Sequence, residues 1–564
     1  MATTQTMSVG DFLLRRLREA GVDKIFGVPG DFNLELVQRV EDQDSVTWIG
    51  TCNELNASYA ADGYARLTGL AALVVTHGVG ALSAINGVAG SYSEHVPVVC
   101  VCGSLPRKSI EGGRMMHHTL ADESHNGFLR AFSEVTVAQA QLTPQNAAAE
   151  IDRVILAALQ HKLPVYVELP SDIAYLQIEV PTQPLTYVAA RSDPERLRAC
   201  AAAIAERLTR AASPAILIDL DANRFGVTDE IVRLGEKRQI PIAAISTSKA
   251  VIDETSPCFR GIYSGAASSP AARDAVERSD CLLAIGVRRI DSTSGFFTDA
   301  LPANTIHLRS YSADVGEDNY QGVTLREVLA VVTDALPAVD GAAPRTAVRR
   351  TARSSQSRSG ALTQAAYWGR IQSFLREGDV LIAEDGTSSA GAIGLTLPPR
   401  CTFITQAVWG SIGYSLGALL GTLIAAPQRR HLLFIGDGSF QLTAQELSTI
   451  LRHDLKPVIF LINNAGYTIE RTILGEKAHY NDVANWAYAK LPKVFRPDTA
   501  AESFVVRTVE ELDDVLSTRH ENLVFIESIM DPADAPADLI TGGHASADLD
   551  YGPRGPQHRK GAQI

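Results

Sequence analysis

The chain of 564 residues has no excess of basic residues, because 51 Lys and Arg stand against 64 Asp and Glu. The formal net charge is −13 and the sequence has no basic stripe, so nucleic acid is not expected as a partner. The seven cysteines are scattered, without CxxC pairs or zinc-ligand spacing. These absences favour reduced thiols and a cytoplasmic protein over a disulfide-rich or zinc-finger protein.

The sequence also has little that suits a membrane. Its first residues, MATTQTMSVGDF, lack the apolar core of a signal peptide. One uncharged run, 401–427, has the length of a membrane span. It holds four glycines, Gln406 and two serines. We therefore expect a buried helix there and no membrane partner.

Length and pattern indicate several α/β domains, because a chain of this size exceeds one hydrophobic core. Buried-strand patterns alternate with helical patterns in three parts of the chain: 1–180, 196–337 and 361–530. This alternation predicts the α/β class with doubly wound parallel sheets. The Pro-containing segment 181–195 and the small, Ser-rich segment 338–360 are typical of linkers. The C-terminal segment 531–564 is rich in Pro, Gly, Asp and Ala, and we expect its end to be disordered.

The strongest local pattern surrounds a Gly-Asp-Gly at 436–438. It follows an apolar run, 432–435, and precedes a helical pattern. A second apolar run, 458–462, then ends in Asn463-Asn464. This is the pattern of a βαβ unit, whose two strands are parallel neighbours. Asp437 and the asparagines would therefore lie at the carboxyl ends of adjacent strands, where open α/β sheets bind ligands.

The residue types at this position suit a metal and a phosphate. Asp437 offers a carboxylate, Asn464 an amide oxygen and the turn at Gly466 a backbone carbonyl, all of which are ligands for Mg²⁺. Gly438 and Ser439 open a helix, whose N–H groups favour an anion. If the segment were only an ordinary turn between a strand and a helix, its glycines would be sufficient. The added asparagine pair favours a site for Mg²⁺ and a diphosphate.

The Gly-Asp-Gly followed about 25 residues later by Asn-Asn resembles the signature of thiamine diphosphate enzymes. NNAGYTIE resembles the version found in 2-keto acid decarboxylases, the group of pyruvate, indolepyruvate and phenylpyruvate decarboxylases. The resemblance runs from GVPGDFN, at 27–33, to about residue 530. It implies that the first and third parts share one topology, as pyrimidine-binding and diphosphate-binding domains on either side of a middle domain.

This resemblance also implies the chemistry and the assembly. The cofactors would be thiamine diphosphate and Mg²⁺, and the reaction the non-oxidative decarboxylation of a small 2-keto acid to an aldehyde and CO₂. The active sites would lie at the interface of a homodimer, commonly doubled to a homotetramer. Glu54, Asp31 and the histidines would come from one subunit, and Asp437, Asn464 and Glu470 from its partner.

The catalytic set follows from matched motifs. Glu54, in NELNASYAADGYAR, would contact N1′ of the aminopyrimidine ring, where a buried carboxylate of raised pKa can share a proton. Asp31, His117, His118 and Glu470 match the acid–base set, which is needed because decarboxylation leaves a carbanion to be protonated. Taken singly, Glu54 would be a helix-dipole partner, Asp31 a turn residue and the histidines surface groups. Their joint occurrence favours the functional interpretation.

Further matched positions would hold the cofactor. Ile412 resembles the bulky apolar residue that supports the bent cofactor, and the Gly410 carbonyl would accept a hydrogen bond from its 4′-amino group. Thr387, Gly438 and Ser439 would complete the cofactor-binding residues.

The substrate pocket is predicted to be roomy. Ser389 and Ala390 stand where relatives often carry aromatic rings, and each lost ring removes on the order of a hundred Å² of apolar wall. Ile469 and Ile473 would form the remaining wall. This predicts aromatic or branched 2-keto acids as substrates, unless Leu539 and Ile540 refill the gap. A strict pyruvate decarboxylase is the alternative.

Other functions fit only parts of the sequence. A carboligase that makes 2-hydroxy ketones would share Glu54 and the Gly-Asp-Gly, but it is not expected to carry Asp31 and the histidine pair. A Ser hydrolase could use Ser415 in a G-x-S-x-G elbow, yet that motif needs a strand and a sharp turn and here lies in a helical run. The dinucleotide-like loop 78–83 lacks its third glycine. A non-catalytic scaffold would not need every catalytic residue type.

Overall fold

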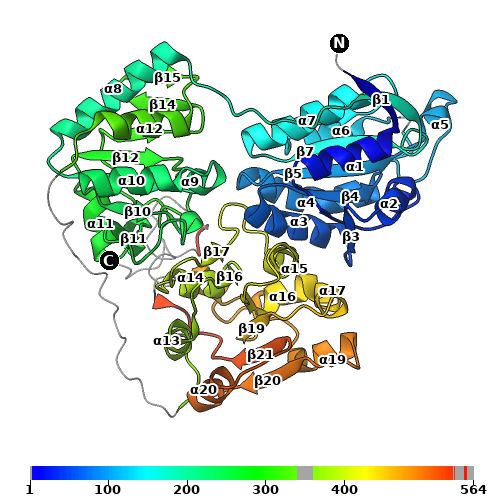
Figure 1. Ribbon diagram of the computed structural model, residues 1–564. Coiled ribbons are helices and arrows are strands. Elements are labelled where there is room, and N and C mark those ends of the chain that lie inside the picture. The colour runs from blue at the N-terminus through cyan, green and yellow to red at the C-terminus, as the bar shows by residue number, and fades with distance from the viewer. Residues whose placement is uncertain (1–2, 123, 340–359, 538, 540–551, 555–564) are drawn as a thin grey trace. The chain divides into compact units, whose positions relative to one another are not determined.

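The structure is a computed structural model that describes residues 3–122, 124–339, 360–537, 539 and 552–554 (Figure 1). The chain forms two compact units. Unit 1 comprises 1–189, 409–428 and 443–455, and unit 2 comprises 190–408, 429–442 and 456–564. Residues 340–359 of the predicted linker and 555–564 of the predicted disordered end lie outside the described residues. The three predicted domain boundaries stay predictions.

Unit 1 is built on a six-stranded parallel sheet in the order β3-β2-β4-β5-β7-β6. Its strands are β2 (Lys24–Gly27), β3 (Thr47–Gly50), β4 (Ala71–Thr76), β5 (Val98–Ser104), β6 (Ala138–Gln141) and β7 (Val165–Pro170). Every residue of β4 and β5 is buried, as expected for a parallel sheet covered on both faces. A separate antiparallel pair joins β1 (Thr4–Ser8) to β8 (Gln177–Pro181).

Helices cover both faces of this sheet. They are α1 (Val9–Glu19), α2 (Leu34–Glu41), α3 (Glu54–Thr68), α4 (Val79–Ser93), α5 (Arg107–Glu111), α6 (Gly127–Ser133), α7 (Ala147–His161), α15 (Tyr414–Ala425) and α17 (Leu447–Arg452). Helix α1 packs against α7 on one face, and α3 packs against α4 on the other (Figure 1). Helix α1 begins after Ser8, whose hydroxyl accepts a hydrogen bond from the Asp11 N–H and so caps the helix.

Small residues let α15 lie directly on α3. A Cβ atom placed on Gly421 would lie 1.9 Å from the carbonyl oxygen of Ala60, and one on Gly63 would lie 2.3 Å from that of Ala418. Ser415 is fully buried inside α15, which rules out an exposed nucleophile at that position. The uncharged run 401–427 thus holds a buried helix of 12 residues, as predicted. No helix within the described ranges has the length and apolarity that a membrane span needs.

The third part of the chain forms a second six-stranded parallel sheet, in unit 2, in the order β17-β16-β18-β19-β21-β20. Its strands are β16 (Val380–Ala383), β17 (Thr402–Ile404), β18 (His431–Gly436), β19 (Val458–Asn463), β20 (Glu502–Val506) and β21 (Val524–Ile529). Counted within its own sheet, each six-stranded sheet has the order 2-1-3-4-6-5. The shared topology implied by the resemblance is therefore confirmed.

The middle part forms a seven-stranded sheet in the order β11-β10-β9-β12-β13-β14-β15. Its strands are β9 (Pro214–Ile218), β10 (Ile242–Ala244), β11 (Phe259–Ile262), β12 (Cys281–Ile285), β13 (Ile306–Leu308), β14 (Ser312–Val315) and β15 (Asp318–Gln321). The first five in spatial order are parallel, but β14 and β15 are antiparallel. This hairpin was not predicted, and its tight turn uses Gly316 with a positive φ of 71°.

The remaining helices belong to the chain's unit 2 segments. They are α8 (Pro194–Arg210), α9 (Asp221–Arg224), α10 (Thr228–Arg238), α11 (Pro270–Glu277), α12 (Leu325–Ala335), α13 (Gln364–Phe374), α14 (Thr387–Ile393), α16 (Asp437–Thr443), α18 (Thr468–Ile473), α19 (Leu491–Phe495) and α20 (Val509–Ser517).

The helical pattern after the Gly-Asp-Gly is broken, in contrast to the single helix that its spacing suggests. Helix α16 ends at Thr443, a 3₁₀ turn spans Ala444–Glu446, and α17 follows. Leu442 is 51% exposed whereas Leu447 is fully buried, so the apolar residues of the two pieces do not share one face. The break falls where the chain passes from unit 2 to unit 1. There the Glu446 carboxylate accepts a hydrogen bond from the Cys52 N–H at 3.1 Å.

Candidate active site

Each six-stranded sheet has a switch point, where the strand order reverses and ligands of open α/β sheets bind. It lies between β2 and β4 in unit 1, and between β16 and β18 in unit 2. The predicted site residues follow these strands: Asp31 follows β2, Thr387 follows β16 and Asp437 follows β18. We name two half-sites after their units. The unit 1 half-site is Asp31, Glu54, His117 and His118, and the unit 2 half-site is Thr387, Asp437, Asn464 and Gly466.

Glu54 is the first residue of α3. Asn53 caps this helix, because its side chain accepts a hydrogen bond from the Asn56 N–H at 2.8 Å. The Glu54 carboxylate lies against the backbone of Gly80, where an added Cβ atom would be 3.1 Å from Oε1. The same Cβ atom would be 3.1 Å from Cγ2 of Thr76, at the end of β4. Glu54 therefore stands at the switch point of the unit 1 sheet.

Glycines bring the other segments of the unit 1 half-site to this point. A Cβ atom on Gly30, just before Asp31, would lie 2.7 Å from Cβ of Thr76. A Cβ atom on Gly78 would lie 2.0 Å from the carbonyl oxygen of His118. The Thr76 hydroxyl is buried and has no hydrogen-bond partner among the described residues. A polar ligand over the end of β4 would satisfy it.

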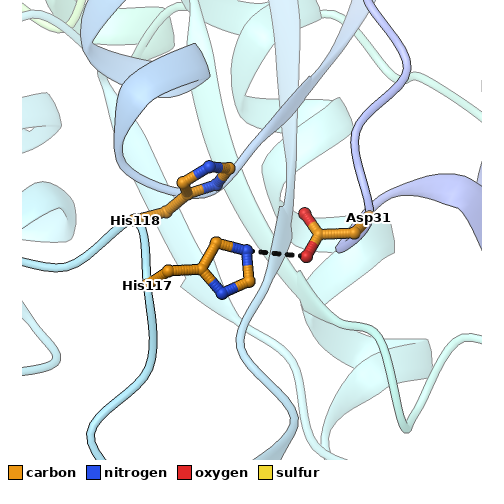
Figure 2. A group of neighbouring side chains, drawn as sticks. All are labelled: Asp31, His117 and His118. Atoms are coloured by element: carbon orange, nitrogen blue, oxygen red, sulfur yellow. Dashed lines mark ion pairs between the residues drawn. The ribbon is translucent and has the colours of Figure 1, made fainter.

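Asp31, His117 and His118 form one cluster (Figure 2). His117 Nε2 lies 2.8 Å from Asp31 Oδ2, and one ligand-type atom of each residue lies within 4.8 Å of the others. The two imidazole rings are 4.4 Å apart at an angle of 70°, and Phe32 stacks on His117 at 5.0 Å. About half of the Asp31 and His117 side chains is exposed. The cluster can therefore exchange protons with a substrate beside it.

In the unit 2 half-site, Asp437 is 1% exposed and begins α16. Its Oδ1 accepts a hydrogen bond from the Gly438 N–H at 2.7 Å, and its Oδ2 accepts one from the Gly466 N–H at 3.1 Å. The ends of β18 and β19 are thereby joined. Gly466 has a φ of 135°, and a Cβ atom there would lie 2.0 Å from the Asn481 carbonyl, so this turn requires glycine.

Burial raises the pKa of Asp437 to about 6, although hydrogen bonds from Gly438 and Gly466 and the charge of Arg471 act in the opposite direction. A bound cation would favour the ionised form of such a carboxylate. Asn464 is also buried, just after the neighbouring strand β19. The Asp437 carboxylate, the Asn464 side chain and the Gly466 carbonyl are oxygen donors that fit Mg²⁺.

The donors for a diphosphate also fit. The Ser388 hydroxyl, in the first turn of α14, is 1% exposed and lacks a partner within the described part of the chain. Thr387 beside it and Ser439 in α16 are also buried. Hydroxyl and backbone N–H groups at these helix starts suit phosphate oxygens.

Arg471 is a supporting residue that the sequence reasoning missed. Its Nη2 donates to the carbonyl of Ala465 at 2.8 Å and pairs with Asp482 at 2.9 Å. The side chain is 8% exposed, so it braces the turn that carries Gly466 from inside. Its position beside Glu470 in the asparagine motif was the available signal.

Glu470 is exposed on α18, whereas its neighbours Ile469 and Ile473 are half-buried. A Cβ atom on Gly386 would lie 3.8 Å from Cγ2 of Ile469, so α18 lies close to the start of α14. Ser389 is buried there, and Ala390 is half-buried. Of the two residues expected to refill the pocket, Ile540 lies outside the described residues.

The loop with Gly410 and Ile412 belongs to unit 1. Ser411, between them, has its hydroxyl 2.6 Å from that of Tyr59 and accepts a hydrogen bond from the Asn86 side chain at 3.0 Å. Gly410 has a φ of 63°, and Ile412 is half-buried. The structure thus brings these two residues to α3 and α4, which flank the unit 1 half-site.

Three sequence families of thiamine pyrophosphate enzymes match the chain; thiamine pyrophosphate is another name for thiamine diphosphate. The N-terminal TPP binding domain matches residues 7–127, the central domain 201–339 and the C-terminal TPP binding domain 386–528. The chain is 41% identical over 551 residues to “Alpha-keto-acid decarboxylase” of Mycolicibacterium paratuberculosis and of Mycobacterium avium, covering 96% of each chain. It is 40% identical over 536 residues to the protein of that name from Mycobacterium tuberculosis, covering 94% of this chain and 95% of the relative. The chain therefore belongs to the thiamine pyrophosphate enzymes, in the family of the alpha-keto-acid decarboxylases.

Proposed function

We propose that the protein decarboxylates a 2-keto acid, without oxidation, to an aldehyde and CO₂. The observation that carries the proposal is the Asp31–His117 contact beside His118, at the same switch point as Glu54. Loss of CO₂ leaves a carbanion, and only a nearby acid turns it into an aldehyde. The printed name of the relatives supports the same substrate class.

Thiamine diphosphate, when bound, supplies the electron sink for the loss of CO₂. In this proposal Mg²⁺ is held by Asp437, Asn464 and Gly466, and the diphosphate by Thr387, Gly438 and Ser439. Glu54 would share a proton with the pyrimidine ring, the Gly410 carbonyl would accept a hydrogen bond from the ring's amino group, and Ile412 would support the cofactor. The hydroxyls of Thr76 and Ser388, which have no partner among the described residues, support a polar ligand at both switch points.

The protein's own residues would orient the substrate and move protons. Asp31 holds the His117 ring through their contact at 2.8 Å, which leaves the other ring nitrogen for the substrate. His117 and His118 would donate protons to the substrate's carbon and oxygen, and Glu470 would be a further acid–base group. Ile469, close to α14, would exclude water from the apolar side of the pocket.

We further propose that two subunits complete each active site. The unit 1 half-site contains Glu54 and the histidine cluster. The unit 2 half-site contains the proposed metal ligands, and Glu470 belongs to the same unit. In the family architecture that the sequence resembles, these two groups come from different subunits. A homodimer is then the minimum active form, doubled to a homotetramer, and we expect it in the cytoplasm.

The pocket is proposed to accept aromatic or branched 2-keto acids, because Ser389 and Ala390 leave space where an aromatic ring would stand. Apolar pockets discriminate by about 1–3 kcal/mol per methylene, so a preference is expected rather than exclusion of pyruvate. A double variant with Ser389→Phe and Ala390→Phe should lose phenylpyruvate turnover far more than pyruvate turnover. If the turnover of both substrates falls equally, or if the natural enzyme acts only on pyruvate, Ser389 and Ala390 do not set the size of the pocket.

The experiment that tests the proposed function compares cofactor-depleted and reconstituted protein on pyruvate, branched-chain, phenylpyruvate and indolepyruvate substrates. Release of CO₂ should require both thiamine diphosphate and Mg²⁺. Turnover of no 2-keto acid by the reconstituted protein, or turnover independent of the cofactor, would contradict the proposal.

A further inference from the structure

His77 is a buried titratable group that the proposed function does not use. It follows β4, and its side chain is 2% exposed. Neither Nδ1 nor Nε2 has a hydrogen-bond partner among the residues that the structure describes. An unpartnered buried polar atom destabilises the fold, so a residue with two of them needs an explanation.

Its surroundings point to the acid–base cluster of unit 1. Gly78, the next residue, is in close contact with the backbone of His118. The Phe128 ring packs edge-on against His77 with the ring centres 5.0 Å apart. Nδ1 of His118 and Nδ1 of His125 are also buried without a partner in the described part of the chain. Three histidines of the described residues thus carry unpartnered imidazole nitrogens, and His118 and His125 lie close enough to His77 to oppose a charge on it.

The electrostatics keep His77 neutral. Burial, followed by repulsion from the charges of His118 and His125, lowers the pKa of His77 to about 4. A neutral imidazole has one N–H donor and one bare nitrogen acceptor. His77 can therefore donate a hydrogen bond to a neighbouring nitrogen without bringing a second positive charge into the cluster.

We propose that His77 is a positioning residue for His118, donating a hydrogen bond through one bridging water to His118 Nδ1. The proposal rests on the acid–base role of His118 in the proposed function. The bond that one imidazole nitrogen makes decides which nitrogen carries the proton. With Nδ1 accepting from the bridging water, the hydrogen of neutral His118 stays on Nε2, so Nε2 is the nitrogen that can give a hydrogen bond to the substrate.

The proposal predicts a change in the pH dependence of the reaction. A hydrogen bond accepted at Nδ1 opposes protonation of that nitrogen, so removing His77 should move the acid–base transition in kcat to higher pH. Among the described titratable groups, Asp31 and His117 cluster with His118, His118 acts on His77, and His125 also acts on His77. Only the contribution of His77 differs between the wild type and a variant at that position.

The test compares His77→Phe, which removes both nitrogens but keeps a ring, with His77→Gln, which keeps a donor. His118→Gln first identifies which limb of the pH profile of kcat depends on His118. His77→Phe should lower kcat about tenfold and shift that limb to higher pH. His77→Gln should recover most of both effects. His453→Phe is the matched control, because burial also lowers the pKa of His453 and that residue lies on a different segment of unit 1. It should leave the pH limb unchanged.

The outcomes separate this inference from the proposed function. Wild-type kcat in His118→Gln would overturn the acid–base role itself. A reduced kcat in His118→Gln, together with an unchanged kcat and pH limb in folded His77→Phe, would overturn the positioning role alone. If His77→Phe does not fold, ¹H–¹⁵N correlation spectra of histidine-labelled wild-type holoenzyme decide. The wild-type signal of His118 is identified by its absence from the spectrum of His118→Gln. That signal should show the Nε2–H tautomer, and the Nδ1–H tautomer would overturn the proposal.

Discussion

At the residue scale, two carboxylates with different surroundings are central to the proposed chemistry. Glu54 is half-buried at the N-terminus of α3, where the helix dipole favours a negative charge. Asp437 is 1% exposed, and burial raises its pKa to about 6. The two residues should therefore respond differently to substitution.

Glu54→Gln keeps the shape of the side chain but cannot share a proton with the pyrimidine ring. We expect kcat at saturating cofactor to fall by roughly 10²-fold or more, the scale of a general acid–base contribution. Steady-state kinetics measure this, and the thermal unfolding midpoint controls for the fold. Turnover close to that of the wild type would exclude Glu54 from cofactor activation.

The affinity for Mg²⁺ and thiamine diphosphate should depend on the ionisation of Asp437. Below about pH 6 the metal must displace a proton, so the affinity should weaken by up to about tenfold per pH unit. Calorimetric titrations between pH 5 and 7.5 measure this, and Asp437→Asn should bind weakly without the pH dependence. Equal wild-type affinity at both ends of the range would contradict the metal role.

The contribution of Asp437 to the stability of the cofactor-free protein should change with pH in the opposite direction, falling as the pH rises. The pKa of Asp437 in the folded protein is above its ordinary value of 3.8, so its contribution to the unfolding free energy is full below that value. It is lost as the pH rises through about 6. Metal binding should therefore stabilise the fold most above pH 6.

The candidate residues of the site could be proposed from the sequence because each sits in a motif of specific spacing. His77 could not, because a histidine after an apolar strand is indistinguishable in sequence from an ordinary core residue. Its significance depends on His118 and His125, which lie some forty residues further along the chain. Arg471 was missed for a similar reason, since its partner Asp482 comes from a later turn.

At the element scale, apolar periodicity located strands well, because the predicted runs 432–435 and 458–462 lie within β18 and β19. The break between α16 and α17 was not predicted, because it depends on the contact between Glu446 and Cys52 rather than on local pattern. The antiparallel strands β14 and β15 were missed because short, half-exposed strands carry little periodic signal.

The close contact between α3 and α15 makes a prediction about glycines. Gly421→Ala places a Cβ atom 1.9 Å from the Ala60 carbonyl, so the helices must separate, at a cost of about 1–3 kcal/mol. Gly369→Ala, in α13, meets nothing within 4 Å and should stabilise by about 0.5–1 kcal/mol. Thermal unfolding midpoints of both variants measure the contrast. Equal shifts in the two variants would contradict the packing described for α15.

At the scale of the whole molecule, the sequence predicted the α/β class, and the resemblance implied the shared order of the two six-stranded sheets. The division into two compact units was not predicted. Residues 409–428 and 443–455 belong to unit 1, although the chain around them belongs to unit 2. That assignment depends on contacts such as Gly421 with Ala60, which join segments more than 350 residues apart.

The proposed sharing of each active site between subunits predicts complementation. Glu54→Gln inactivates one half-site and Asp437→Ala the other. A purified heterodimer of the two variants would contain one doubly damaged site and one intact site, and should recover about half of the wild-type activity. The two homodimers, purified in the same way, are the controls and should be nearly inactive. A heterodimer as inactive as both controls would mean that Glu54 and Asp437 act within one chain.

The most direct test of the central claim is the simultaneous measurement of 2-keto acid consumed, CO₂ released and free aldehyde formed by the reconstituted enzyme. Decarboxylation with protonation by the histidine cluster predicts one CO₂ and one aldehyde for each 2-keto acid consumed. Release of CO₂ with a 2-hydroxy ketone as the main product, and little free aldehyde, would contradict the account and identify a carboligase.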